Sequence, residues 1–178
     1  MYVPYEYTPD KRWPIILWLH GGGPRGADGL RHTNTDIAAA IRQNSQRFPA
    51  IVVMPQARDG HRWDDAMKRQ AVAALEASTR EFHGDIDRTY LVGYSMGGRG
   101  TWTLAWQQPD RFAALIVIAG PVVDIPPEWT ADERATALRE IEFLRAGDPY
   151  AALASKIRNI PIRIFHGLAD TQIGRAHV

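Results

Sequence analysis

Short apolar runs recur along the chain, and each ends where a loop rich in Gly, Pro, His or Asp begins. Runs of strand length cover residues 14–20, 50–54, 89–93, 113–119 and 162–165. Strands of a parallel sheet are covered on both faces, so they read as continuous apolar stretches rather than as alternating ones. The pattern therefore predicts a mostly parallel sheet, with any binding site beyond the carboxyl ends of its strands.

Segments with a helical pattern lie between these runs. In 64–82 the apolar side chains share one helical face, and most charged side chains lie off that face. Residues 96–107 form a second predicted helix, which Pro109 ends, and 34–43 form a third. The charged, alanine-rich segment 130–144 is interpreted as a surface helix, with a cap over the site as the alternative. Strands that alternate with helices predict one three-layer α/β domain, with helices on both faces of the sheet.

Composition narrows the function classes. The chain has 178 residues, 45% of them apolar, which suits one domain with a sizeable core. Its 21 Lys and Arg nearly balance 20 Asp and Glu, so no net field favours nucleic acid or an anionic membrane surface as a partner. The absence of Cys excludes a disulfide framework, a thiolate metal site and a cysteine nucleophile. We therefore expect a small-molecule partner and, without a ligand cluster or dinucleotide fingerprint, no metal and no cofactor.

The N-terminal residues do not identify a compartment. They lack the charged and apolar regions of a signal peptide, and no run in the chain approaches the length of a membrane span. Residues Tyr2 to Tyr7 alternate as an edge strand does, which favours Met1 as an internal methionine of a longer gene. The compartment and the oligomeric state therefore stay open.

The most specific motif is Gly93-Tyr94-Ser95-Met96-Gly97, which matches G-x-S-x-G between a predicted strand and a predicted helix. A serine on such a turn adopts a strained backbone conformation, and glycines two residues before and after it let the neighbouring chain pass without Cβ clashes. The N-terminus of the following helix stabilises negative charge beside the hydroxyl. Ser95 is therefore the candidate nucleophile.

A glycine-rich loop, Gly21-Gly22-Gly23, follows the first predicted strand. It is similar to the HGGG-type loop of esterases and lipases, which brings a backbone N–H close to an acyl oxygen. Alone, such a run also fits a flexible loop or a phosphate cradle, but its place ahead of the serine motif favours an oxyanion loop. His20 lies far upstream of where the base belongs in this order, so we interpret it as a hydrogen-bonding residue beneath the loop.

Together these motifs resemble the α/β-hydrolase superfamily, and within it the carboxylesterase and "predicted peptidase" group related to polyhydroxybutyrate depolymerases and feruloyl esterases. The similar segments are WPIILWLHGGGPRG (13–26), VVMPQ (52–56), DIDRTYLVGYSMGGRGTWTLAWQQPDRFAALIVIAG (85–120) and IPIRIFHGLAD (160–170). They span most of the chain, and 85–120 is the most specific of them. In this family the glycine-rich loop often continues as G-E-R-G, whereas here Arg25 follows a proline.

The resemblance implies a role for five residues. Ser95 would be the nucleophile and Asp170 the acid of the catalytic triad. The amide of Gly21 or Gly22, together with that of Met96, would donate to the oxyanion. These roles come from the resemblance and from the order of the motifs along the chain.

Three further residues have alternative interpretations. Asp124 follows the preceding strand, where a minority of α/β-hydrolases keep their acid, but the HG-x-x-D loop favours Asp170. Gln56 and Trp63 lie on loops that resemble the pocket wall of the family, although packing or capping roles are more common for such residues.

The catalytic histidine of the family follows the acid, beyond one further strand. His177 stands seven positions after Asp170 with no strand between them. The segment 173–178 also matches the translation of a common short-read sequencing adapter, so we expect it to be a scar outside the domain 1–172. On this interpretation the chain ends within the acid loop, the last strand and helix are missing, and the fragment is nearly inactive without its histidine.

The sequence thus favours a serine hydrolase that cleaves a carboxylic ester, small or polymer-linked, through an acyl-enzyme. A serine peptidase of the prolyl-oligopeptidase type is the alternative among enzymes. A non-catalytic hydrolase-like binding domain is the alternative outside them.

Overall fold

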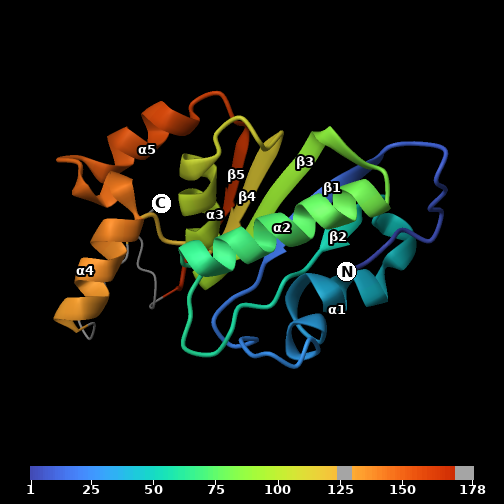
Figure 1. Cartoon of the computed structure of the whole chain (residues 1–178), viewed down its shortest axis with the longest axis horizontal. Coiled ribbons are helices and arrows are strands. Elements are labelled where there is room, and N and C mark those ends of the chain that lie inside the picture. Colours follow the sequence, from blue (N-terminus) through green and yellow to red (C-terminus); the bar gives the residue numbers. More distant parts are fainter. Residues whose placement is uncertain (124–129, 171–178) are drawn as a thin grey trace.

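The computed structural model in Figure 1 describes residues 1–123 and 130–170. It contains one sheet of five parallel strands in the order β2-β1-β3-β4-β5. The strands are β1 (Trp13–Leu19), β2 (Ile51–Val53), β3 (Gly84–Tyr94), β4 (Ala114–Ile118) and β5 (Ile162–Phe165). Each apolar run of the sequence coincides with one of these strands, so the prediction of a mostly parallel sheet is confirmed.

Helices cover both faces of the sheet, which confirms the three-layer α/β arrangement. One face packs against α2 (Asp65–Glu81), α3 (Met96–Gln107) and α5 (Pro149–Ile157), and the other against α1 (Asp36–Gln43). The surface helix α4 (Ala131–Glu140) lies with α5 on the β5 side (Figure 1). The described residues also include three 3₁₀ turns: η1 (Arg31–Thr33), η2 (Ser45–Arg47) and η3 (Glu142–Arg145). None of the helices in the described ranges is long and apolar enough to cross a bilayer.

Strand β1 lies at the centre of the core. Its successive side chains point to opposite faces of the sheet. Ile15, Leu17 and Leu19 are fully buried in the cluster that contains α2 and α3, whereas Trp18 packs in the cluster that contains α1. Burying each such side chain contributes about 1.5–3 kcal/mol. The loop after β1 therefore starts from a firmly held strand.

The helix predicted for 130–144 is wrong in its length. Helix α4 ends at Glu140, and Ile141 takes a conformation with φ −112° and ψ 84° before η3 begins. Ile141, Phe143 and Leu144 are all buried. In one unbroken helix, positions 141 and 143 would point about 200° apart, so they could not both face the core. The chain leaves the helix and buries all three.

Helix α5 was not predicted from the sequence, although its start carries two signals. The Asp148 side chain accepts from the N–H groups of Tyr150 and Ala151, both at 3.0 Å, and Pro149 occupies the first helical position. Only Leu153 and Ile157 are buried in this helix, so its apolar period is weak.

The edge strand predicted at Tyr2 to Tyr7 is also wrong. Tyr2 and Val52 exchange a pair of backbone hydrogen bonds at 2.8 and 3.0 Å, which forms a single antiparallel bridge beside β2. Pro4 lacks an N–H and cannot extend the ladder. The segment touches the sheet edge at one point and does not add a strand.

Helix α3 crosses the end of β4 at very short range. A Cβ on Gly98 would lie 2.6 Å from the Cα of Gly120, closer than real Cβ atoms approach other atoms. Both partners at this crossing are backbone, so neither can rotate away. The missing side chain of Gly98 is therefore what lets α3 pack onto the sheet.

We predict that Gly98→Ala lowers the free energy of unfolding by about 1–3 kcal/mol, because the added methyl group forces α3 away from β4. Gly147→Ala is the matched control, since a Cβ there meets nothing within 4 Å, and it should change stability by no more than about 0.5 kcal/mol. Thermal and urea unfolding measure both. A Gly98→Ala protein as stable as the parent would contradict the close crossing.

Candidate active site

Ser95 lies on the sharp turn between β3 and α3, as the G-x-S-x-G motif predicts. Its backbone has φ 52° and ψ −114°, a conformation that non-glycine residues rarely adopt and that costs about 1–3 kcal/mol. Two hydrogen bonds hold it: Ser95 N–H donates to Ile118 O at 2.8 Å, and Arg99 N–H donates to Ser95 O at 3.1 Å. The half-buried serine is thus fixed between the sheet and the first turn of α3.

The two glycines of the motif are sterically required. A Cβ on Gly93 would lie 2.1 Å from Gly97 O, and a Cβ on Gly97 would lie 1.8 Å from Leu19 O. Both contacts are with backbone atoms, so no side-chain adjustment could relieve them. The serine turn therefore exists only because the chain has no side chain at either position.

The amide of Met96 lies at the N-terminus of α3, directly after Ser95. The first N–H groups of a helix have no partner within the helix, and the helix dipole adds partial positive charge there. Helix α3 has 12 residues, long enough for this effect. The structure thus brings a helix N-terminus to the serine, as predicted.

The glycine-rich loop lies directly against the serine turn. A Cβ on Gly97 would lie 2.8 Å from His20 O, and a Cβ on Gly21 would lie 3.0 Å from the ring of Tyr94. Gly97 and Tyr94 flank Ser95 on its two sides. The structure therefore brings together the loop and the turn, which are separated by about 70 residues in the sequence.

His20 is fully buried, and both of its ring nitrogens are used for structure. Its Nδ1 lies 2.6 Å from Gly21 O, and its Nε2 lies 2.9 Å from the backbone nitrogen of Ala57. Because the Ala57 N–H must donate to Nε2, the proton of the neutral imidazole sits on Nδ1 and donates to Gly21 O. The prediction that His20 is a hydrogen-bonding residue beneath the loop is confirmed.

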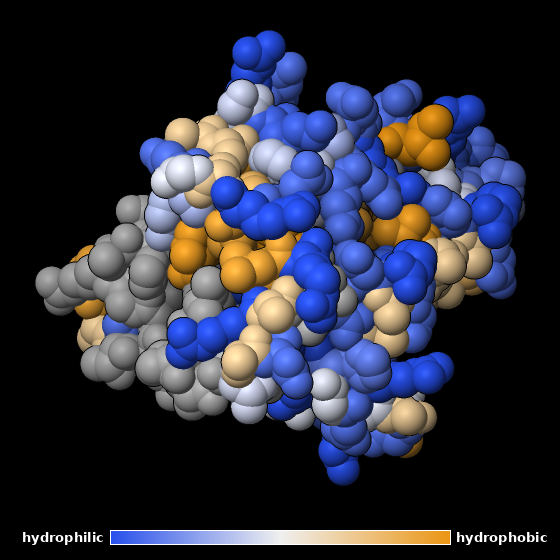
Figure 2. Space-filling model, turned by 60° about the vertical axis from the view of Figure 1, so that its left-hand side comes forward, coloured by the Kyte–Doolittle hydropathy of each residue, from blue (hydrophilic) through white to orange (hydrophobic). Residues whose placement is uncertain are grey.

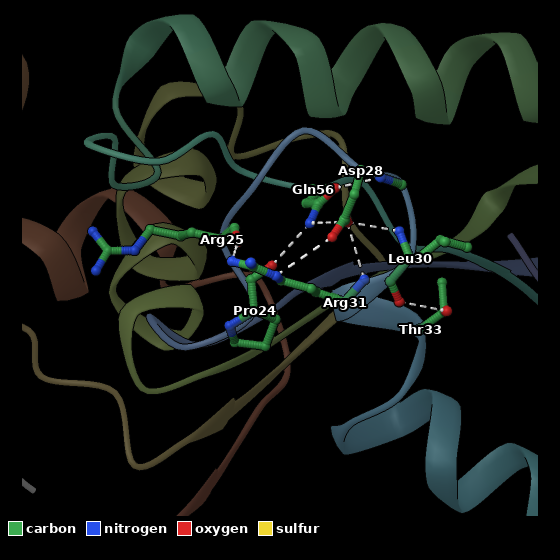
Figure 3. A network of polar contacts seen from close by, with 8 residues as sticks. Pro24, Arg25, Asp28, Leu30, Arg31, Thr33 and Gln56 are labelled. Atoms are coloured by element: carbon green, nitrogen blue, oxygen red, sulfur yellow. Dashed lines mark hydrogen bonds and ion pairs between the residues drawn. The ribbon is translucent and has the colours of Figure 1, made fainter.

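Gln56 and Trp63 hold loops in place. Gln56 Oε1 accepts from Gly29 N–H at 2.8 Å, and its Nε2 donates to Pro24 O at 3.1 Å (Figure 3). The buried Trp63 donates from Nε1 to His20 O at 2.9 Å, and its Cβ packs against Gly100 of α3. The structure therefore shows a capping role for Gln56 and a packing role for Trp63, the more common interpretation given above.

Asp28 is the hub of the polar network in Figure 3. Its Oδ1 accepts from the N–H groups of Leu30 and Arg31 at 2.9 and 3.1 Å and from Gln56 Nε2 at 3.0 Å. These bonds favour the ionised carboxylate and lower the pKa of Asp28 to about 2. The segment that continues the glycine-rich loop is therefore held by a carboxylate that stays charged at neutral pH.

Asp170 lies in the loop after β5, two strands away from Ser95. Ser95 N–H donates to Ile118 O and Ala119 N–H donates to Phe165 O, both at 2.8 Å, so the ends of β3, β4 and β5 lie side by side. Two strand spacings, about 10 Å, separate the end of β3 from the end of β5. The structure thus places Asp170 on the same edge of the sheet as Ser95.

His166 is the neighbour of Asp170 that the sequence reasoning missed. Its Nε2 lies 3.6 Å from Asp170 Oδ2, which is an ion-pair distance but too long for a hydrogen bond. Both side chains are largely buried, at 10% and 21% exposure. The HG-x-x-D spacing was the available signal, because it returns the chain in a tight turn that Asp170 N–H closes onto Gly167 O.

An apolar groove of about 660 Å³ lies between α3, α5 and β5, and His166 is one of the residues that line it. Its walls include Trp102, Leu153, Ile162 and Ile164. Figure 2 shows apolar side chains gathered on this side of the molecule.

Some sequence predictions lie outside the described residues. These are the rival acid Asp124, the candidate histidine His177 and the proposed scar 173–178. Within residues 1–123 and 130–170, no three His, Asp or Glu side chains are grouped so that they could hold a metal ion.

The buried histidines make stability depend on pH. Burial lowers the pKa of His20 below its ordinary value of 6.5, and burial does the same for His32. As the pH falls through 6.5, the unfolded chain takes up a proton on each of these histidines while the folded chain does not. The contribution of the neutral histidines to the free energy of unfolding is therefore complete above this pH and is lost as the pH falls below it. Protonated His20 also cannot accept from Ala57 N–H.

We predict that the free energy of unfolding falls between about pH 7 and pH 5, and that His20→Gln has a shallower slope. His83→Asn is the control, because His83 is exposed and its left-handed backbone suits Asn, and it should keep the parent slope. Urea unfolding at a series of pH values measures this. Equal slopes in the parent and His20→Gln would contradict a buried neutral His20.

Comparison with known proteins agrees with this architecture. The chain is 27% identical over 178 residues to an "Uncharacterized secreted protein" of Arthroderma benhamiae, covering 94% of the chain and 19% of that protein. It is 26% identical over 190 residues to feruloyl esterase B of Thermothelomyces thermophilus, covering 95% of the chain and 64% of that enzyme. The chain thus spans less than two thirds of the length of either relative.

A solved structure with the same fold is that of a thermostable esterase. It matches with a TM-score of 0.68 at 23% identity, covering 99% of this chain and 44% of the other. A family model described as "Putative esterase" matches residues 1–176. With the α/β-hydrolase fold and a serine turn set against a glycine-rich loop, this match over almost the whole length shows that the chain belongs to the Esterase family.

Proposed function

We propose that the protein cleaves carboxylic esters through an acyl-enzyme on Ser95. The observation that carries the proposal is the backbone of Ser95, held at φ 52° between a strand and a helix N-terminus with the glycine-rich loop against both flanking residues. A strained residue persists only where the surrounding structure enforces it, and such strain is concentrated at functional sites. Membership of the Esterase family favours an ester over an amide as the substrate.

The reaction requires a base that takes the proton from Ser95 Oγ. As that proton leaves, Oγ forms a bond to the carbonyl carbon, and the π electrons move onto the carbonyl oxygen. The Met96 N–H and the N–H of Gly21 or Gly22 donate to this oxyanion. The oxyanion collapses, the C–O bond to the alcohol breaks, and the protonated base returns its proton to the leaving oxygen.

The second half of the reaction repeats these steps with water. The base takes a proton from water, the hydroxide oxygen attacks the acyl carbon, and the bond to Ser95 Oγ breaks as Oγ regains a proton. We assign the base to a histidine that follows Asp170 in the sequence, in the order serine, acid, histidine. Asp170 would fix the tautomer of that histidine and stabilise its charged form.

The substrate is a small-molecule ester or an ester linked to a polymer. The similarity to feruloyl esterase B supports an acyl group of aromatic acid type as the first class to assay, beside a simple acetyl ester. The near balance of acidic and basic residues supports a neutral substrate rather than a highly charged one.

We predict that Ser95→Ala, in the protein expressed from its complete reading frame, loses p-nitrophenyl acetate hydrolysis and fluorophosphonate labelling while its unfolding temperature barely changes. The substitution removes only the Ser95 hydroxyl, so the acyl group and the probe lose their point of attachment while the rest of the chain is unchanged. Ser155→Ala, an exposed serine on α5, is the control and should be labelled like the parent. Labelling of Ser95→Ala at the parental rate would exclude Ser95 as the nucleophile.

We predict that Asp170→Asn lowers kcat by about 10⁴, because an amide would hold the histidine in the wrong tautomer. The fold should persist, since Asn has nearly the same shape as Asp and Asp170 lies in a loop outside the sheet. Asp124→Asn is the comparison, because it tests the rival acid directly. If Asp124→Asn carries the large loss and Asp170→Asn does not, the assignment of the acid is wrong.

A further inference from the structure

Three consecutive carbonyl groups in the glycine-rich loop each accept a hydrogen bond from a side chain. His20 O accepts from Trp63 Nε1 at 2.9 Å, and Gly21 O accepts from His20 Nδ1 at 2.6 Å. Gly22 O accepts from Arg25 Nε at 2.8 Å. Side chains therefore hold every peptide carbonyl from His20 to Gly22.

These bonds also set the directions of the N–H groups that follow. In a trans peptide the C=O of one residue and the N–H of the next point in opposite directions, and the described residues contain no cis peptide. Fixing the carbonyls of His20, Gly21 and Gly22 therefore fixes the N–H groups of Gly21, Gly22 and Gly23. An oxyanion hole works only when its donors are aimed before the charge develops.

At the tip of this loop there is open space where side chains would stand. A Cβ on Gly22 or on Gly23 would meet no atom within 4 Å, and glycine itself samples a wide range of backbone angles. Gly21, by contrast, lies against the Tyr94 ring. At Gly22 and Gly23, hydrogen bonds must therefore supply the order that neighbouring atoms supply at Gly21.

Arg25 is suited to this task because its own backbone is held on both sides. Pro24 O accepts from Gln56 Nε2 at 3.1 Å, and Gly26 N–H donates to Ala57 O at 2.9 Å. The Arg25 side chain is held as well, since its Nη1 reaches His61 O at 3.5 Å. A planar guanidinium whose stem is fixed presents Nε in a defined direction, which a lysine ammonium cannot do.

We propose that Arg25 is a positioning residue of the oxyanion hole: its Nε–H···O=C bond fixes the peptide plane between Gly22 and Gly23 and thereby restricts the backbone of Gly22, whose N–H is one of the two candidate donors in this loop. The proposal rests on the proposed esterase function. Arg25 touches no reacting atom in this role and acts through the backbone of Gly22 and Gly23. Its loss should weaken transition-state binding and leave substrate binding almost unchanged.

Arg31 provides a matched control in the same loop. Its side chain is 63% exposed and pairs with Asp28 at 3.4 Å. Its Nη1 reaches Arg25 O only at 3.5 Å, the upper limit of a hydrogen bond, so replacing Arg31 removes one long bond to the loop and none to a glycine. Figure 3 shows the Arg31 side chain turned into the Asp28 network, whereas the guanidinium of Arg25 extends away from it. Both residues carry the same charge close to the same loop, but of the two it is Arg25 whose side chain bonds a glycine carbonyl.

The test compares Arg25→Met, Arg25→Lys and Arg31→Met with the parent, all expressed from the complete reading frame. For p-nitrophenyl acetate we expect kcat to fall about 10- to 100-fold in both Arg25 variants, with KM unchanged within about twofold. Arg31→Met should stay within about twofold of the parent in both constants. Affinity for a boronic acid that mimics the tetrahedral intermediate should fall in proportion to kcat in the Arg25 variants.

A readout that does not depend on activity separates this proposal from the proposed function. Backbone ¹⁵N order parameters of Gly22 and Gly23 should fall in both Arg25 variants and stay unchanged in Arg31→Met. If the parent hydrolyses no ester but these order parameters still respond to Arg25, the esterase proposal fails and the ordering of the loop by Arg25 stands. Unchanged order parameters, unchanged kcat, or full activity in Arg25→Lys would each overturn the positioning role.

Discussion

The contact between the end of β1 and the first turn of α3 is the constraint on which the site depends. The carbonyl of Leu19 occupies the space that a side chain on Gly97 would fill, 1.8 Å from the position of that missing Cβ. This contact fixes the serine turn and the start of the glycine-rich loop against one another. Neither can shift without breaking backbone packing, because atoms in a close-packed interior have no free volume to move into. The position of Ser95 relative to the glycine-rich loop is therefore set by packing in the core.

The segment after β2 is the second support of the site. Between Gln56 and Trp63 it supplies one amide, two carbonyls and two side chains that bond the glycine-rich loop or the residues next to it, in the range 20–29. A loop built on glycines loses more conformational freedom than any other on folding, so it needs external partners to stay in one shape. Buried hydrogen bonds are suited to this, since breaking one leaves an unsatisfied polar group that costs about 1–3 kcal/mol. The residues at the centre of the glycine loop can thus lack side chains and still be ordered.

Much of this architecture could be predicted from the sequence, and the part that could not has a common cause. Strands β1 to β5 can be recognised locally, because strands buried on both faces give continuous apolar runs. The serine turn can be recognised because steric crowding requires glycine at positions 93 and 97. The bond from Arg25 to Gly22 cannot be recognised in this way, since any polar side chain near a carbonyl could make it. The break at Ile141 and the helix α5 depend on which surfaces lie nearby, and a short window of sequence does not contain that information. His166 was overlooked for the same reason, as its meaning comes from its distance to Asp170.

The serine turn with the glycine-rich loop, and the loop that carries Asp170, are packed against the core to different extents. Ser95 and the glycine-rich loop rest on β1 and β3, whose inward side chains Leu17, Leu19 and Leu91 are fully buried. Asp170 follows β5 at the sheet edge, where Ile162, Ile164 and Phe165 are 40%, 47% and 50% exposed. Strand β5 pairs with β4 alone among the described strands, and Ala119 N–H donates to Phe165 O at the end of the pairing. Local opening costs less where few apolar contacts must break, so within the described residues the loop that carries Asp170 is more easily displaced than the serine turn. A catalytic triad tolerates more movement in its acid than in its other parts. The oxyanion donors and the nucleophile must be aimed at the reacting atoms themselves, whereas the acid acts through the histidine that it orients.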